Sequence, residues 1–163
     1  MDENLKWFFV PYNFKKKIYS NLEKLKMVLA ANQKIRISSR TENIILVEKM
    51  IDGVCELFSI NQDYYGNILV ALTEAVNNAI YHGNKSNENK NIDITFKSSP
   101  TQVSFIVKDE GAGFDFDNLP DPTTPENVEN LNGRGVFLMR HLADKVSYKE
   151  NGSKVILDFK INT

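Results

Sequence analysis

The chain has 163 residues, and the 42% of them that are hydrophobic suffice to fill the core of one domain. Its 20 basic and 21 acidic residues leave a net charge of −1, which argues against a dedicated nucleic-acid binder, and its single cysteine excludes a disulfide framework or a multi-cysteine zinc site within the chain. No apolar run approaches the length of about 18 residues that a membrane span needs, and the N-terminus lacks a signal-peptide pattern, so we expect a cytoplasmic protein without a membrane span.

The balance of charge changes along the chain. Residues 1–36 carry eight basic and three acidic side chains, whereas the remaining residues carry 12 basic and 18 acidic ones. This step divides the chain into a basic N-terminal appendage at residues 1–33 and a globular domain at residues 34–163. Apolar residues at helical spacing predict a short helix over residues 13–30, which would be a solvated extension or a segment that meets a membrane surface or a partner.

The first half of the globular domain reads as one strand and two helices. Residues 34–38 can form an edge strand. Apolar residues spaced three and four apart predict a helix over 44–58, with Ser39 or Thr41 as its cap. A second apolar stripe predicts a helix over residues 63–81.

The second half contains mostly strands. In chain order it has a hairpin over residues 92–96 and 103–107, an irregular segment at 110–130, a helix at 136–142, and strands at 145–149 and 154–160 joined at Asn151-Gly152. Strands grouped apart from helices predict an α+β fold. We expect a two-layer α/β sandwich, a mixed, mostly antiparallel sheet with helices on one face.

The predicted helix over 63–81 carries a polar stripe beside its apolar one. At about 100° per residue, Glu74, Asn78 and His82 lie within roughly 80° of one another. Most such stripes are solvated faces, but asparagine and histidine form helices poorly, which suggests that they have a task here. Glu74 can act as a general base or orient a water molecule. The amide oxygen of Asn78 suits Mg²⁺, which prefers oxygen ligands and few of them from protein.

Asp109 follows the predicted hairpin and precedes two glycines. A carboxylate only accepts hydrogen bonds, so Asp109 can bind an amino group such as that of adenine. Gly111 and Gly113 allow the backbone to approach a ligand closely. A plain Asp-Gly turn explains the same residues, and this string alone is weak evidence for a site.

Two further segments contain glycine beside a polar side chain. Gly133, Arg134 and Gly135 precede a predicted helix, whose first amides and dipole favour an anion and whose arginine can contact phosphate. The hydroxyl of Ser153, next to a turn glycine, could bond a ligand. Loop flexibility and a hairpin turn explain each segment equally well when it is taken alone.

Taken together and in this order, the segments resemble the ATP-binding domain of the gyrase, heat-shock-protein-90, histidine-kinase and mismatch-repair superfamily. The stretch from Glu74 to Gly83 looks like its N box, residues 109–113 look like the first glycine box, and residues 133–135 look like the second. Ser153 stands where a threonine is common and keeps the hydroxyl. Residues 113–140 are similar to the lid and second glycine box of anti-sigma-factor serine kinases of the RsbW type.

The resemblance implies a histidine-kinase-like ATP-binding domain, with ATP and Mg²⁺ as cofactors. It implies that Glu74 is the general base and that Asn78 holds Mg²⁺ against the phosphates. It also implies that Asp109 binds the adenine amino group and that residues 114–132 form a lid. The remaining residues of the implied nucleotide site are His82, Gly111, Gly113, Gly133, Arg134, Gly135 and Ser153.

The same resemblance implies an activity and partners. The chain would be an ATP-dependent serine-protein kinase and anti-sigma regulatory factor. It would transfer the γ-phosphate to a Ser or Thr of a STAS-type anti-anti-sigma protein and sequester a sigma factor, usually as a homodimer and without contacting nucleic acid. Two alternatives stay open: a nucleotide-binding partner-switching module without kinase activity, and the catalytic ATP-binding unit of a histidine kinase system. Glu74 favours the kinase, because nucleotide binding alone needs no base.

Overall fold

The computed structural model describes residues 16, 33–99, 101–116, 118, 119 and 133–161. Its elements, in chain order, are β1 (Lys34–Ser38), the 3-10 turn η2 (Thr41–Asn43), α3 (Ile44–Leu57), α4 (Gln62–Asn78), the π-helix η3 (Ala79–Gly83), β2 (Asn91–Ser99), β3 (Gln102–Lys108), α5 (Arg134–Leu142), β4 (Lys145–Lys149), the 3-10 turn η5 (Glu150–Gly152) and β5 (Lys154–Lys160). Almost all of the predicted appendage with its helix over 13–30, and most of the predicted lid, lie outside the described residues. No helix in the described part of the chain is long and apolar enough to cross a membrane.

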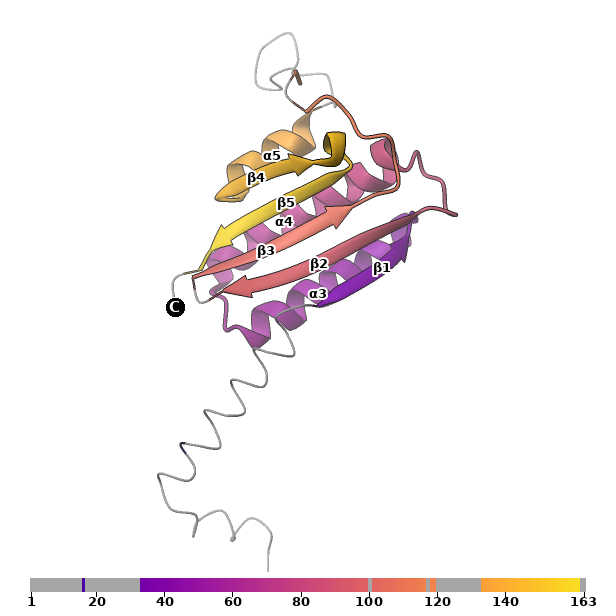
Figure 1. The fold of residues 1–163 in the computed structure, drawn as a ribbon. Helices are drawn as coiled ribbons and strands as arrows, with labels where there is room; N and C mark the ends of the chain where they lie inside the picture. Colours follow the sequence, from indigo (N-terminus) through magenta and orange to yellow (C-terminus); the bar gives the residue numbers. More distant parts are fainter. Residues whose placement is uncertain (1–15, 17–32, 100, 117, 120–132, 162–163) are drawn as a thin grey trace, which may run out of the picture.

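The described strands form one sheet in the order β1-β2-β3-β5-β4, and every neighbouring pair is antiparallel (Figure 1). Successive side chains of a strand point to opposite faces. One face of the three central strands is therefore mostly apolar and buried, through Ile92, Ile94, Phe96, Val103, Phe105, Val107, Val155, Leu157 and Phe159. The strands expected at 34–38, 92–96, 103–107, 145–149 and 154–160 are confirmed.

The described helices cover this apolar face, and none of them lies on the other face of the sheet (Figure 1). The predicted apolar stripes are the buried ones: Val47, Ile51 and Val54 on α3, and Ile68, Leu72, Ala75 and Val76 on α4. Four phenylalanine rings contact one another in series across the core. Their centroids are 5.4 Å apart between Phe58 and Phe96, 5.3 Å between Phe96 and Phe105, and 6.3 Å between Phe105 and Phe159. The predicted two-layer α+β sandwich is confirmed, but its described strands are all antiparallel and do not form the mixed sheet that we expected.

The start of α3 differs from the expectation. Neither Ser39 nor Thr41 caps it. The Ser39 hydroxyl donates to the Lys90 carbonyl at 3.1 Å, and the Thr41 hydroxyl lies 3.0 Å from the Tyr81 hydroxyl. The predicted cap was wrong because both hydroxyls have partners that are distant in sequence.

The helix expected over 63–81 has different ends. It begins one residue earlier, where the Asn61 side chain accepts the Asp63 N–H at 3.1 Å and acts as the N-cap. Beyond Asn78 the chain widens into the π-helix η3, and the Asn84 N–H donates to the Ala79 carbonyl at 2.8 Å. Such wide turns occur often at functional sites.

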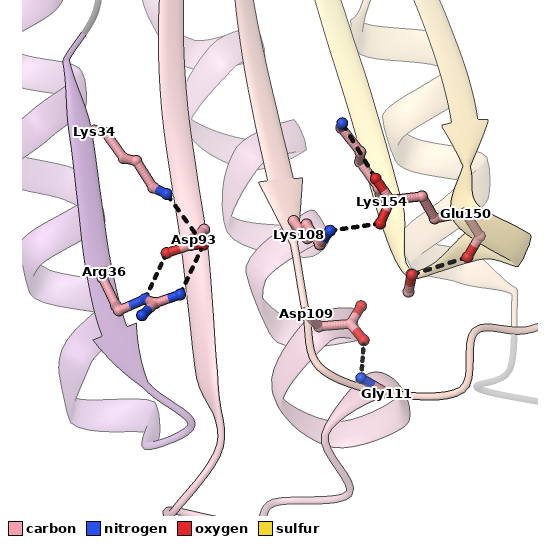
Figure 2. A network of polar contacts seen from close by, with 9 residues as sticks. Lys34, Arg36, Asp93, Lys108, Asp109, Gly111, Glu150 and Lys154 are labelled. Atoms are coloured by element: carbon pink, nitrogen blue, oxygen red, sulfur yellow. Dashed lines mark hydrogen bonds and ion pairs between the residues drawn. The ribbon is translucent and has the colours of Figure 1, made fainter.

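The edge strand β1 is attached to β2 by charge as well as by backbone pairing. Arg36 donates to the two carboxylate oxygens of Asp93 at 2.8 and 3.1 Å, and Lys34 lies 3.1 Å from the same carboxylate (Figure 2). The hydrogen bond from Arg36 is the main reason why the pKa of Asp93 is lowered.

Candidate functional site

A cavity of about 480 Å³ lies among α4, η3, the loop after β3, the first turn of α5 and the η5 end of the sheet. Its volume is in the range typical of small-molecule sites. Eight of the residues predicted from sequence line it: Glu74, Asn78, His82, Asp109, Gly113, Gly133, Arg134 and Gly135. Gly111 and Ser153 are not among the lining residues. The fold thus brings together segments that are far apart in the chain.

Glu74 and Asn78 lie one turn apart on α4, and both side chains reach the first turn of α5. A methyl group on Gly135 would lie 2.7 Å from Glu74 Oε2 and 3.2 and 3.3 Å from the two polar atoms of the Asn78 side chain. The carboxylate and the amide therefore converge on one point of the backbone. Only glycine leaves room for both there.

The N-terminus of α5 faces the same space. Its N-cap, Gly133, has φ 87°, a left-handed conformation that glycine adopts without strain. The first amides of a helix have no acceptor within that helix and lie at the positive end of its dipole. With the exposed Arg134 beside them, these amides form an end of the cavity that favours an anion.

The π-helix η3 brings His82 to the cavity, where its side chain is exposed. The next residue, Gly83, also lines the cavity and lies against the loop after β3. Glu74, Asn78 and His82, the polar stripe predicted from α-helical spacing, thus all line the same cavity. His82 differs from the prediction in lying in a π-helical turn, which is wider than an α-helical one.

Asp109 directly follows the last residue of β3 and lines the cavity, and the residue is 9% exposed. Its Oδ1 accepts the Gly111 N–H at 2.7 Å, which holds the carboxylate in place (Figure 2). Burial raises the pKa of Asp109, and the bond from Gly111 opposes that shift in part. A buried carboxylate of this kind can accept a hydrogen bond from a ligand amino group. Gly111 therefore acts by positioning Asp109.

Gly113 and the η5 turn hold the loop after β3 close to the sheet. Gly113 has φ 83°, and a methyl group there would overlap the Asn151 carbonyl, which accepts the Phe114 N–H at 2.9 Å. The Ser153 hydroxyl donates to the Glu150 carbonyl at 2.8 Å, and the Ser153 carbonyl accepts the Asp109 N–H at 3.0 Å. The serine thus supports the turn and the strand end that carries Asp109.

Sequence reasoning missed Asn84, which joins three segments around the cavity. The residue is 1% exposed. Its amide nitrogen donates to the Ser39 hydroxyl at 2.7 Å and to the Asn91 carbonyl at 3.0 Å, and its oxygen accepts the Glu110 N–H at 2.8 Å. Asparagines in a polar loop are expected to be exposed, and nothing in the neighbouring sequence indicates that Asn84 is buried.

Tyr148, on β4, was also missed. Its ring stacks on Phe116 with centroids 4.7 Å apart and meets Phe114 edge-on at 5.5 Å. Burial raises the pKa of Tyr148 to about 12, and among the described residues its hydroxyl is the one buried side-chain polar atom without a hydrogen-bond partner. This residue lines the cavity, together with Phe114 and Leu119 from the segment that precedes α5.

The walls of the cavity combine three chemical features. They include a buried carboxylate, a helix N-terminus with an arginine, and apolar side chains, among them Val107, Met139 and Val155. A ligand with an amino group, an apolar flat ring and a strong negative charge meets all three, and adenine nucleotides have that composition. The residues present therefore fit ATP.

The site also fits Mg²⁺. No cluster of three His, Cys, Asp or Glu side chains occurs among the residues that the structure describes. Mg²⁺ does not need one, because it keeps several waters and binds one or two protein oxygens together with substrate phosphates. The Asn78 amide, next to Glu74 and to the start of α5, offers an oxygen where phosphates would lie.

Sequence and fold relate this chain to known proteins. Residues 37–159 match the histidine kinase-like ATPase domain. The serine-protein kinases RsbW of Staphylococcus aureus strains JH9 and Newman are 30% identical to this chain over 126 residues, which cover 72% of this chain and 79% of each relative. The crystal structure of the RsbU and RsbW domains of Rv1364c from Mycobacterium tuberculosis has the same fold, with a TM-score of 0.57 and 14% identity over 80% of this chain and 32% of that one. The family resemblance read from the motifs is confirmed: the chain belongs to the histidine kinase-like ATPase domain family and is similar, within it, to the RsbW serine-protein kinases.

Proposed function

We propose that this protein is an ATP-dependent serine-protein kinase and anti-sigma regulatory factor. The observation that carries the proposal is the convergence of the Glu74 carboxylate and the Asn78 amide at Gly135, in a cavity that also contains the Asp109 carboxylate. In this proposal Glu74 is the base, Asn78 is the Mg²⁺ ligand and the first turn of α5 binds the phosphates, and their proximity supports these roles. Phosphoryl transfer needs this kind of positioning and charge neutralisation more than covalent help.

Each residue has a role in the proposed reaction. Asp109 accepts the adenine amino group and orients the nucleotide. Asn78 contributes an oxygen ligand to Mg²⁺, which neutralises phosphate charge when bound. Arg134 and the first amides of α5 bind phosphate oxygens. Glu74 accepts the proton of the attacking Ser or Thr hydroxyl as its oxygen bonds to the γ-phosphorus and ADP leaves.

The partners in this proposal follow from the resemblance to the RsbW kinases. The phosphate acceptor is a Ser or Thr of a STAS-type anti-anti-sigma protein, and the second partner is a sigma factor that the kinase sequesters. The protein acts in the cytoplasm as a homodimer, with residues 1–33 as an appendage to the nucleotide-binding domain at residues 34–163. Residues 114–132 form the lid over the nucleotide.

Two assays separate the kinase from its alternatives. Calorimetry measures Mg·ATP binding, and transfer of labelled γ-phosphate to a STAS-type protein measures catalysis. Glu74→Gln should bind ATP like the wild type and lose about a hundredfold or more of the transfer rate, because a general base contributes that much. Asp109→Asn should weaken binding itself.

The alternatives predict different results. A wild-type protein that binds ATP but transfers nothing to any STAS-type protein would be the partner-switching module without kinase activity. Transfer to a histidine of a separate protein would identify the unit of a histidine kinase system. No ATP binding at millimolar concentration would reject all three nucleotide-dependent functions.

A further inference from the structure

Figure 1 shows that no described helix covers one face of the sheet. The strand residues on this open face are mostly basic. Cross-strand register defines its rows, because directly opposed residues of antiparallel strands share a face. One row runs Arg36, Asp93, Lys108, Lys154 and Lys149 from one edge of the sheet to the other.

Two further rows lie beside it, the nearer one mainly uncharged and the second with two lysines and one aspartate. One runs Lys34, Thr95, Ile106, Ile156 and Ser147, and the other runs Lys97, Ser104, Asp158 and Lys145. With Lys160, which opposes Gln102, this open face has eight basic and two acidic strand residues. The whole chain has a net charge of −1, so the basic residues are concentrated here.

The arrangement places like charges next to each other. Lys154 directly opposes both Lys108 and Lys149, and like charges at opposed positions destabilise a sheet. Glu150 offsets part of this repulsion, with carboxylate oxygens 2.6 Å from Lys108 and 3.3 Å from Lys154 (Figure 2). It does so from a left-handed backbone conformation, with φ 52°, that costs energy for a residue other than glycine. This one carboxylate therefore pairs with two of the three lysines in the row.

A hollow of about 250 Å³ lies on this face between β1 and β5. Ile106 and Thr95 line it, together with four lysines and one aspartate: Lys34, Lys97, Lys108, Lys154 and Asp93. The Asp93 carboxylate is already paired with Lys34 and Arg36. Ile156, half-buried, continues the apolar strip beside Ile106. The surface thus offers a small hollow with an apolar floor, bordered by four lysines and by one aspartate that is neutralised by its own basic partners.

We propose that the open sheet face, with the hollow over Ile106 at its centre, docks an acidic polypeptide segment that places an apolar side chain in the hollow. Acidic residues on both sides of that side chain would contact Lys97, Lys108 and Lys154. The surface lies on the opposite side of the sheet from the nucleotide cavity, so this proposal is independent of the proposed kinase activity.

Charge excludes the other occupants that the chain itself could supply. A second copy packed face to face through this surface would oppose lysine to lysine. Residues 1–33 have six basic and three acidic side chains and are not complementary to it. Nucleic acid is disfavoured because, among the described strand residues, this face has no aromatic side chain on which a base could stack.

The test uses the full chain and a fluorescently labelled peptide of alternating Glu and Leu, with anisotropy as the readout. We expect binding that weakens as salt is raised. Lys97→Glu and Lys108→Glu should each raise the dissociation constant about tenfold or more, because each reverses a charge at the contact. Lys49→Glu is the matched control, since Lys49 is exposed on α3 in the opposite layer, and it should leave the dissociation constant within about twofold.

Further arms address the hollow and the fold. A peptide of alternating Glu and Ser should bind more weakly than the Glu–Leu peptide, because it has no apolar side chain to place in the hollow. Lys108→Arg keeps the charge and should bind like the wild type. Thermal unfolding of every variant identifies one that fails to fold.

Three results would overturn the proposal. In the first, Lys49→Glu weakens peptide binding as much as Lys97→Glu, which would mean attraction to the molecule as a whole. In the second, single-stranded DNA of matched charge binds this face more tightly than the peptide. In the third, sedimentation shows that Lys97→Glu dissociates a dimer of the wild type, so that a second copy occupies the face.

Discussion

Gly83 leaves the space that the Asp109 carboxylate occupies. A methyl group on Gly83 would lie 2.6 and 2.7 Å from the two carboxylate oxygens. The end of the π-helix and the residue that follows β3 can therefore pack in contact because Gly83 has no side chain. The N box and the first glycine box, which are separate motifs in the sequence, form one structural unit at this contact.

Gly83→Ala should displace Asp109 and weaken ATP binding about tenfold or more, since the carboxylate loses its position toward the ligand. Overpacking of this kind should also lower the free energy of unfolding by about 1–3 kcal/mol. Calorimetry and urea unfolding measure the two effects. The matched control is Gly66→Ala on α4, where no atom lies within 4 Å of the added methyl group. That variant should bind ATP normally and gain about 0.5–1 kcal/mol in stability.

Asp109→Asn should weaken ATP binding without destabilising the fold at neutral pH. Because burial raises the pKa of Asp109, the folded state binds its proton more tightly than the unfolded state does. The ionised carboxylate therefore lowers the stability of the wild type at neutral pH, and the neutral amide avoids that cost.

The gain in the free energy of unfolding of Asp109→Asn over the wild type should be complete above the raised pKa of Asp109. It should disappear as pH falls below 3.8, the ordinary pKa of aspartate. Urea unfolding of both proteins across this range measures it. A stability difference that grows toward acid pH would contradict the assigned direction of the shift.

Asn84→Ala should lower the free energy of unfolding by about 3 kcal/mol. It removes three hydrogen bonds and leaves the Glu110 N–H without its acceptor in a partly buried position. Asn87→Ala, in the same loop, should cost less than about 1 kcal/mol, because Asn87 is exposed and its side chain accepts one local bond. Equal losses in the two variants would show that Asn84 does not connect the segments around the cavity.

Tyr148→Phe should leave stability unchanged or raise it by up to about 1 kcal/mol, since it removes a buried hydroxyl that has no partner and keeps the ring contacts. Tyr65→Phe provides the contrast, because that hydroxyl donates to Asp52 at 2.8 Å. We expect Tyr65→Phe to lower the free energy of unfolding by about 0.5–1 kcal/mol. Thermal unfolding of the two variants side by side gives the comparison, and a larger loss for Tyr148→Phe would mean that its hydroxyl has a partner.

The amino-acid sequence by itself determined the elements and the family. Apolar residues at helical spacing placed the buried faces of α3 and α4, and strict alternation placed β2, β3 and β5. Both patterns are local, because a helix or strand repeats its faces every few residues. The polar stripe from Glu74 to His82 and the glycines around Asp109 and Arg134 were readable for the same reason.

Only the tertiary structure decided which polar groups meet. Ser39 and Thr41 bond residues 51 and 40 positions away instead of capping the next helix. Asn84 is buried because three distant segments close around it, and Tyr148 reaches the cavity from the far edge of the sheet. The basic rows of the open face likewise exist only through the register of five strands. Hydrogen bonds and charges between distant residues depend on how layers pack, and local spacing carries no information about that.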